Sequence, residues 1–196
     1  MTWGADEVAM ADHEVDFADP AAPEALFASL VAEGPITGLV MCHCESVDSD
    51  IRSTTVESFD RHFAVNARSV WLLIRAFAAQ LSGGTSLVPV GRIVALTSDH
   101  TAFNLPYGAS KGALDRIVLA AAVELAGRGV AANVINPGPN DTGWMSPDVR
   151  REVLDRNLQP RIGTPSDTAD LVSFLLSPAG GWINGQQLYS NGGLRP

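Results

Sequence analysis

Three short apolar runs, separated by longer segments of helical periodicity, constrain the fold of this chain more than any other feature. The runs cover residues 37–42, 91–97 and 130–136, and a polar or proline-containing turn follows each of them. Continuous apolar runs of this length are typical of strands buried on both faces of a parallel sheet. Because helical segments lie between the runs, the sequence predicts an α/β fold, a doubly wound parallel sheet in a three-layer α/β/α arrangement.

The remaining segments complete this alternation of strands and helices. Capping and turn residues mark the ends of the other predicted elements. Helices are predicted over residues 20–33, 55–81, 106–127, 148–157 and 166–176, and further strands over His13–Phe17 and 186–190. Ser166 is the predicted N-cap of the last helix. The chain shows neither an internal repeat nor a linker, so residues 1–196 are predicted to form one domain.

The charge, the length of the apolar runs and the cysteine content of the chain limit which partners and cellular locations are expected. The chain carries a net charge of −9 spread along its length, which argues against binding to nucleic acid or to anionic membrane surfaces. No apolar run is long enough to span a bilayer, and no secretory-signal pattern is visible. Cys42 and Cys44 are the only cysteines, and two cysteines one residue apart form no disulfide framework. A cytoplasmic location is therefore expected.

A candidate catalytic group lies around the start of the helix predicted over residues 106–127. Tyr107 and Lys111 are four residues apart, which places both side chains on one helix face. An ammonium beside a phenol favours the phenolate, so we expect Lys111 to lower the pKa of Tyr107 and make it a proton donor or acceptor near neutral pH. Ser98, at the end of the preceding strand, offers a hydroxyl to a substrate oxygen. Taken singly, the three residues are equally consistent with a helix cap, a helix-start aromatic and a solvated lysine.

The strand-end serine followed by Tyr-x-x-x-Lys resembles the active site of the short-chain dehydrogenase/reductase family. Asn66 within the helix predicted over residues 55–81, Asn-Pro-Gly at 136–138 and the Arg161–Pro165 segment follow the family's order. The resemblance runs from about residue 15 to the end and is nearest to 3-oxoacyl-[acyl-carrier-protein] reductases. It implies a Rossmann-like fold that interconverts small-molecule carbonyls and secondary alcohols with NAD or NADP.

The resemblance also implies roles for individual residues. Tyr107 would transfer the proton, and Lys111 would tune it and hold the ribose. Ser98 would orient the substrate oxygen, and Asn66, at a helix kink, would support the proton path. The implied cofactor-binding residues are Asp16, Phe17, Cys42, Tyr107, Lys111, Pro137, Gly138 and Thr142. Family members pair through the two long helices, so a homodimer or homotetramer through residues 55–81 and 106–127 is expected.

Two features depart from the family pattern. No glycine-rich turn of the Thr-Gly-x-x-x-Gly-x-Gly kind is present, and Gly4 is the only glycine before Gly34. Three explanations are open: a start codon assigned downstream of the true one, a βαβ unit supplied by another polypeptide, or a first strand that re-pairs directly beside residues 37–42. The absence also leaves an alternative function, a non-catalytic subunit or pseudoenzyme that cannot bind a dinucleotide alone.

The second departure is Met41-Cys42-His43-Cys44, which stands where the family has Asn-Asn-Ala-Gly. Three adjacent ligands cannot readily face one metal ion, and no further cysteine completes a zinc site, so no metal is expected. The loop from Ser98 to Tyr107 is also shorter than usual, and within it His100 is either a second proton carrier or incidental. Substrate specificity is expected to lie in residues 99–106 and 140–162.

Overall fold

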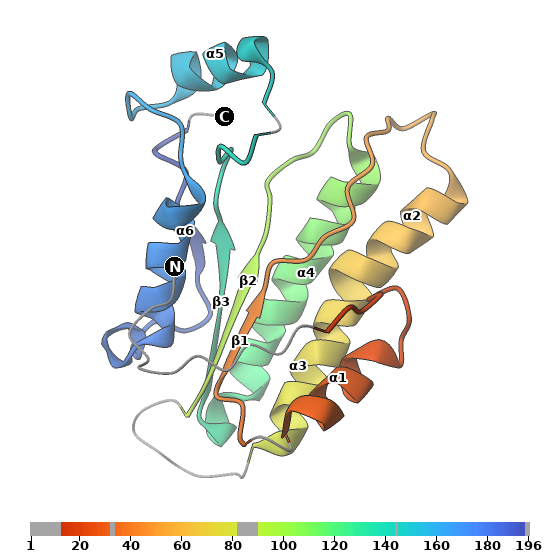
Figure 1. The fold of residues 1–196 in the computed structure, drawn as a ribbon, viewed down its shortest axis with the longest axis vertical. Coiled ribbons are helices and arrows are strands. Elements are labelled where there is room, and N and C mark those ends of the chain that lie inside the picture. The colour runs from red at the N-terminus through yellow and green to blue at the C-terminus, as the bar shows by residue number, and fades with distance from the viewer. Residues whose placement is uncertain (1–12, 32–33, 82–89, 144, 195–196) are drawn as a thin grey trace.

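A four-stranded parallel sheet forms the centre of the structure. The computed structural model describes residues 13–31, 34–81, 90–143 and 145–194. The strands lie side by side in chain order, all parallel, as Figure 1 shows. They are β1 (Gly38–Met41), β2 (Gly91–Leu96), β3 (Val130–Asn136) and β4 (Gln187–Tyr189). The predicted α/β fold is confirmed, and the carboxyl ends of the strands all meet at one edge of the sheet.

Helices cover both faces of this sheet. The helices are α1 (Ala22–Leu30), α2 (Val56–Phe63), α3 (Ser69–Gln80), α4 (Leu105–Glu124), α5 (Pro147–Arg156) and α6 (Pro165–Leu176). In Figure 1, α1 to α4 lie on one side of the sheet, α6 lies on the other, and α5 lies beyond the carboxyl end of β3. This is the predicted three-layer arrangement. No helix in the described segments is long and apolar enough to cross a membrane.

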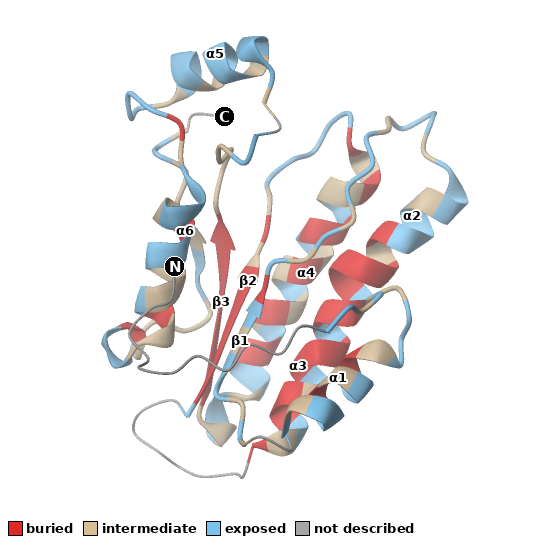
Figure 2. Cartoon of the chain, in the orientation of Figure 1, coloured by how far each residue is buried: buried red, intermediate tan, exposed pale blue. Residues whose placement is uncertain are grey.

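The core explains why the strand sequences are continuously apolar. Ile93 is fully buried in the larger cluster, toward α3 and α4, where it joins Phe77 and Leu114. Its neighbour Val94 faces the opposite side, where it packs with Leu175 of α6. Successive strand residues point to opposite faces, so a strand covered by helices on both sides is apolar at most positions. The buried polar residues Arg92 of β2 and Asn133 of β3 are exceptions. Figure 2 shows buried residues along β2 and β3 and on the facing sides of α3 and α4.

The predicted strand over His13–Phe17 is wrong. These residues form a loop that runs into a turn, in which the Asp19 backbone N–H donates to the Asp16 carbonyl at 3.0 Å. The Ala18 N–H donates to Asp16 Oδ1 at 2.9 Å, which draws this backbone further into the turn. Among the described residues, no strand pairs with the outer edge of β1. Re-pairing of the first segment beside β1 is therefore not what the chain does.

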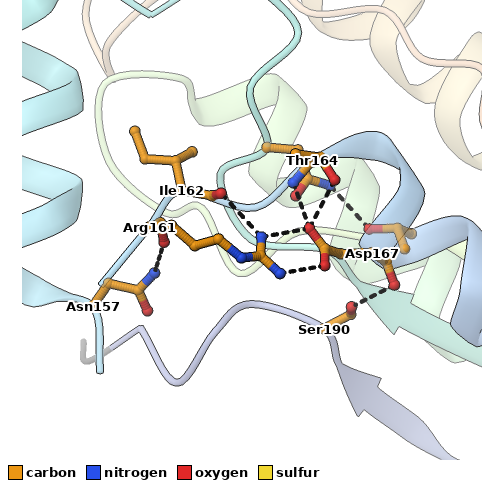
Figure 3. A network of polar contacts seen from close by, with 8 residues as sticks. Asn157, Arg161, Ile162, Thr164, Asp167 and Ser190 are labelled. Carbon is orange, nitrogen blue, oxygen red and sulfur yellow. Dashed lines mark hydrogen bonds and ion pairs between the residues drawn. The ribbon is translucent and has the colours of Figure 1, made fainter. Parts of the chain in front are cut away.

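The N-cap of α6 is Thr164, two residues before the predicted Ser166. Asp167 Oδ2 accepts hydrogen bonds from the Thr164 backbone N–H at 2.7 Å and from its hydroxyl at 2.8 Å. Arg161 donates to both carboxylate oxygens of Asp167, at 2.7 and 2.6 Å, as Figure 3 shows. These bonds hold the pKa of the Asp167 carboxyl well below its usual range. Pro165 occupies the first helical turn, where its missing N–H costs nothing.

The two assignments of the N-cap make different predictions. Thr164→Ala removes the capping hydroxyl and should lower the free energy of unfolding by about 1 kcal/mol. Ser166→Ala, already inside the helix, should change it by less than about 0.5 kcal/mol. Urea unfolding followed by circular dichroism measures both, and equal losses would contradict the assignment of Thr164.

Candidate active site

The structure brings Asn66, Ser98, Tyr107 and Lys111 together at the carboxyl edge of the sheet. Ser98 follows the end of β2, and Tyr107 and Lys111 lie in the first two turns of α4. The Ser98 side chain lies close enough to the Tyr107 hydroxyl to lower its pKa. Asn66 lies between α2 and α3, in a π-helical turn that packs against α4. Side chains from three separate parts of the chain therefore converge on one place.

Lys111 is the most buried charged group of this site. Lys111 is only 3% exposed, and its Nζ donates a hydrogen bond to the Leu96 carbonyl at 2.8 Å. The same nitrogen lies 5.8 Å from the centroid of the Tyr107 ring. Burial lowers the pKa of Lys111, because an ammonium loses its hydration in a buried site. The lysine thus ties α4 to the end of β2.

Burial, and not Lys111, dominates the acidity of Tyr107. The pKa of its phenol is raised, first by burial and then by the nearby Cys44, while the nearby Ser98 side chain lowers it. The expected lowering of this pKa by Lys111 is therefore wrong for the free protein. The reason is geometric: the ammonium lies over the ring and is engaged by the Leu96 carbonyl. The phenol of the free protein is a proton donor at neutral pH.

Asn66 holds a neighbouring loop through its side-chain amide. It is fully buried, its Oδ1 accepts from the Glu45 N–H at 2.7 Å, and its Nδ2 donates to the Glu45 carbonyl at 2.9 Å. The same Nδ2 donates to Ser110 Oγ at 2.9 Å, and Ser110 donates to the Tyr107 carbonyl at 2.8 Å. The π-helical turn that replaces a regular helix here is a feature common at functional sites. Asn66 thus connects the loop after β1 to the start of α4.

Sequence reasoning missed Glu45 and Ser110. Glu45 contributes only backbone atoms to this network, so its residue type carries no signal. Ser110 lies beside Lys111 in the sequence, where a serine is a common surface residue of a helix. Its full burial, which only the packed structure gives, is the sign of its role.

The turn after β1 is organised by His43. Its Nε2 lies 2.8 Å from Ser69 Oγ, and the ring of Phe17 packs against the imidazole, with centroids 4.5 Å apart and the ring planes tilted by 38°. Burial, and then the charge of Lys111, lowers the pKa of His43 to about 4. A neutral imidazole thus occupies the place of the alanine in the family's Asn-Asn-Ala-Gly turn. Cys42 and Cys44 on either side of it are exposed.

The residues predicted to bind the cofactor lie near the carboxyl edge of the sheet, and they differ in exposure and in their contacts. Asp16 is exposed and lies 3.5 Å from Arg61 in an ion pair. Gly138 has a φ of +59°, and a Cβ there would lie 2.5 Å from the Asn191 side chain. Only glycine fits this close approach without strain. Pro137 precedes it at the end of β3, and Thr142 lies exposed in the following loop.

The short loop between Ser98 and Tyr107 packs its backbone directly against α4. A Cβ on Gly108 would lie 2.1 Å from the His100 carbonyl oxygen, so the loop needs a glycine at this point of the helix. The His100 N–H donates to Ser98 Oγ at 3.1 Å, and its ring meets Tyr107 edge-on at 6.4 Å. Phe103 is 81% exposed and has a φ of 61°, rare for a residue with a side chain. This loop forms one wall beside the tyrosine.

Comparison with known proteins agrees with this arrangement. A family model described as "Enoyl-(Acyl carrier protein) reductase" matches residues 3–195. The chain is 37% identical over 152 residues to an uncharacterized oxidoreductase of Bacillus subtilis, covering 76% of this chain and 60% of the relative. It is 36% identical over 192 residues to the chloroplastic NADPH-dependent aldehyde reductase 2 of Arabidopsis thaliana, covering 92% and 69%. The chain thus spans about two thirds of the length of these relatives.

Solved structures with a similar fold include two that contain a bound nicotinamide cofactor. A blue fluorescent protein from a metagenomic library, in complex with NADPH, superimposes with a TM-score of 0.82 at 28% identity, covering 93% of this chain and 74% of the other. A short chain dehydrogenase from Burkholderia cenocepacia, in complex with NADP, superimposes with a TM-score of 0.81 at 28% identity, covering 92% and 74%.

The low pKa of His43 predicts a pH-dependent stability. Its folded pKa of about 4 lies below the ordinary value of 6.5, so between these values the unfolded chain binds more protons than the folded one. The stability contribution is complete above pH 6.5 and is lost as the pH falls toward 4, by up to about 3 kcal/mol. Urea unfolding at several pH values should show this slope, and His43→Asn should flatten it. Parallel slopes for the two proteins would contradict the assignment.

Proposed function

The chain belongs to the short-chain dehydrogenase/reductase family, an oxidoreductase family, and from this premise we propose that it reduces a small-molecule carbonyl to a secondary or primary alcohol with NADPH. The family relation carries the reaction class. The choice of NADPH rests on the relative named as an NADPH-dependent aldehyde reductase and on the solved structures in complex with NADPH and NADP. The substrates that best fit the proposal are aldehydes, ketones and 3-oxoacyl thioesters.

One observation supports the proposal most strongly: the phenol of Tyr107 lies next to the Ser98 hydroxyl, which lowers its pKa, and beside a buried ammonium. A carbonyl oxygen that accepts from both hydroxyls would be polarised, and its carbon would become more electrophilic. The raised pKa of Tyr107 keeps the proton on the phenol at neutral pH, as the reduction direction requires. Ser98 would orient the substrate oxygen without changing its own protonation state.

The described residues fit the nicotinamide end of the cofactor. Asn136 is 2% exposed, and its Nδ2 has no hydrogen-bond partner although its Oδ1 accepts from the Gly138 N–H at 3.0 Å. Such a buried donor, directly before Pro137, suits a carboxamide or ribose oxygen. Lys111, Gly138 and Thr142 would complete this part of the site. The cofactor, when bound, supplies the hydride.

The residues of the chain then divide the remaining tasks. Tyr107 donates its proton to the oxygen of the reduced substrate, and the resulting phenolate is stabilised by the Lys111 ammonium. Ser110 and Asn66 hold the Tyr107 backbone and keep the phenol in position. We also propose that the protein binds the whole dinucleotide, including its pyrophosphate.

Tyr107→Phe tests this function because it removes the phenolic proton and keeps the ring. We expect kcat/KM for NADPH-dependent carbonyl reduction to fall at least about 100-fold. Tyr189→Phe, at the only other tyrosine, is the matched control and should retain turnover. Consumption of NADPH at 340 nm with a panel of aldehydes, ketones and a 3-oxoacyl thioester is the measurement. Absence of both NADPH binding and turnover in the wild type would overturn the proposal in favour of a non-catalytic subunit.

We further propose that two copies pair through the outer face of α2, α3 and α4. Apolar side chains stand exposed on all three helices: Val56 at 71%, Trp71 at 49% and Val123 at 78%. Exposed apolar surface of this kind is typical of a protein interface. Sedimentation equilibrium should give a dimer or tetramer for the wild type and smaller species for Val123→Glu. A monomeric wild type would contradict the pairing.

A further inference from the structure

The face of α4 that carries Tyr107 and Lys111 continues by one more turn to Asp115. The three residues are spaced four apart, so their side chains follow one another along the helix. Asp115 is half-buried, and its Oδ1 is fully enclosed without a hydrogen-bond partner. Burial raises the pKa of the Asp115 carboxyl, and the neighbouring hydroxyl of Thr97, at the end of β2, lowers it in part. An enclosed carboxylate oxygen without a partner is costly, so its presence requires a compensating interaction.

Of the two cationic neighbours that lower the pKa of the Asp115 carboxyl, Lys111 has the larger effect. It is the only lysine of the chain, and its Nζ donates to the Leu96 carbonyl, one residue before Thr97. Thr97 is itself buried, and its Oγ1 lies 3.5 Å from the Lys111 carbonyl oxygen. The end of β2 therefore contacts the ammonium through Leu96 and the carboxyl through Thr97. The ammonium and the half-buried carboxylate each favour the charged form of the other.

The other ionisable groups around Lys111 do not replace this carboxylate. Tyr107 on α4 and the Cys42, His43 and Cys44 turn face it from the other side. Cys44 and Cys42 attract the ammonium more strongly than Asp115 when they are ionised. Burial raises the pKa of Cys42, however, and a carboxylate ionises at much lower pH than a thiol. On the far side of Asp115, Arg116 is a second, weaker cationic neighbour.

We propose that Asp115 is a positioning residue of the site, whose carboxylate, next to Thr97, keeps the Lys111 ammonium charged and fixed against the end of β2 beside Tyr107. Asp115 touches neither substrate nor cofactor and acts through Lys111. The effect of Asp115 on turnover rests on the proposed reductase function. Its effect on Lys111 is a property of the folded chain alone, so the two can be tested separately.

The single lysine makes a direct test possible. Protein labelled with lysine carrying ¹³C at Cε gives one lysine resonance, whose shift with pH reports the pKa of Lys111. Asp115→Asn keeps the shape of the side chain and removes its charge, and should lower that pKa by about one pH unit. Glu124→Gln, an exposed carboxylate on the same helix, is the matched control and should leave the pKa unchanged. Asp115→Glu should restore most of the wild-type value.

The wild type supplies a test that needs no variant. Its Lys111 resonance should shift a second time at acidic pH, when Asp115 takes up a proton. This step should vanish in Asp115→Asn and persist in Glu124→Gln. An unchanged Lys111 pKa in a folded Asp115→Asn, or the absence of the acidic step in the wild type, would overturn the proposal.

Kinetics separate this proposal from the proposed function. In an active protein, Asp115→Asn should shift the pH dependence of kcat/KM and reduce kcat with little change in the substrate KM. If no carbonyl is reduced but the Lys111 titration behaves as described, the reductase function fails and the role of Asp115 stands. If turnover is found but the Lys111 titration is insensitive to Asp115, the reductase function stands and the role of Asp115 fails.

Discussion

The contact between Lys111 and the end of β2 is the constraint on which the rest of the site depends. An ammonium in so buried a place must find fixed partners, and the 2.8 Å hydrogen bond to the Leu96 carbonyl is one of them. This bond fixes α4 relative to β2. Tyr107 lies one turn before the lysine and Ser98 two residues beyond the carbonyl, so both are placed by the same contact. Loop, helix start and strand end therefore form one rigid unit.

Much of this unit could be predicted from the sequence, because it follows from periodicity and spacing. Burial of β2 and β3 on both faces leaves continuous apolar runs, and these gave the parallel sheet. The four-residue spacing of Tyr107 and Lys111 placed them on one helix face. The family resemblance implied a helix kink at Asn66, and the structure has a π-helical turn there. Local patterns suffice where local geometry decides the outcome.

The predictions failed where contacts between distant segments decide. The segment His13–Phe17 alternates like a strand, but its backbone is engaged in a turn and no strand among the described residues receives it. The pKa of Tyr107 depends on burial, which residue spacing does not reveal. Asp115 looks like an ordinary surface charge in the sequence, because the closure of its Oδ1 depends on how α4 packs. Burial of polar atoms is the information that only the folded chain adds.

The reductase function proposed for this chain requires Tyr107 to be a half-buried phenol that keeps its proton until carbonyl reduction. Ultraviolet titration at 295 nm of a Tyr189→Phe protein, which retains Tyr107 as its only tyrosine, tests it most directly. We expect a pKa above the ordinary value of 10.0 in the free protein. With saturating NADP⁺ we expect a lower pKa, because a cationic ring beside the phenol favours the phenolate. A pKa at or below that of free tyrosine, or one that NADP⁺ leaves unchanged, would show that Tyr107 is not the proton donor.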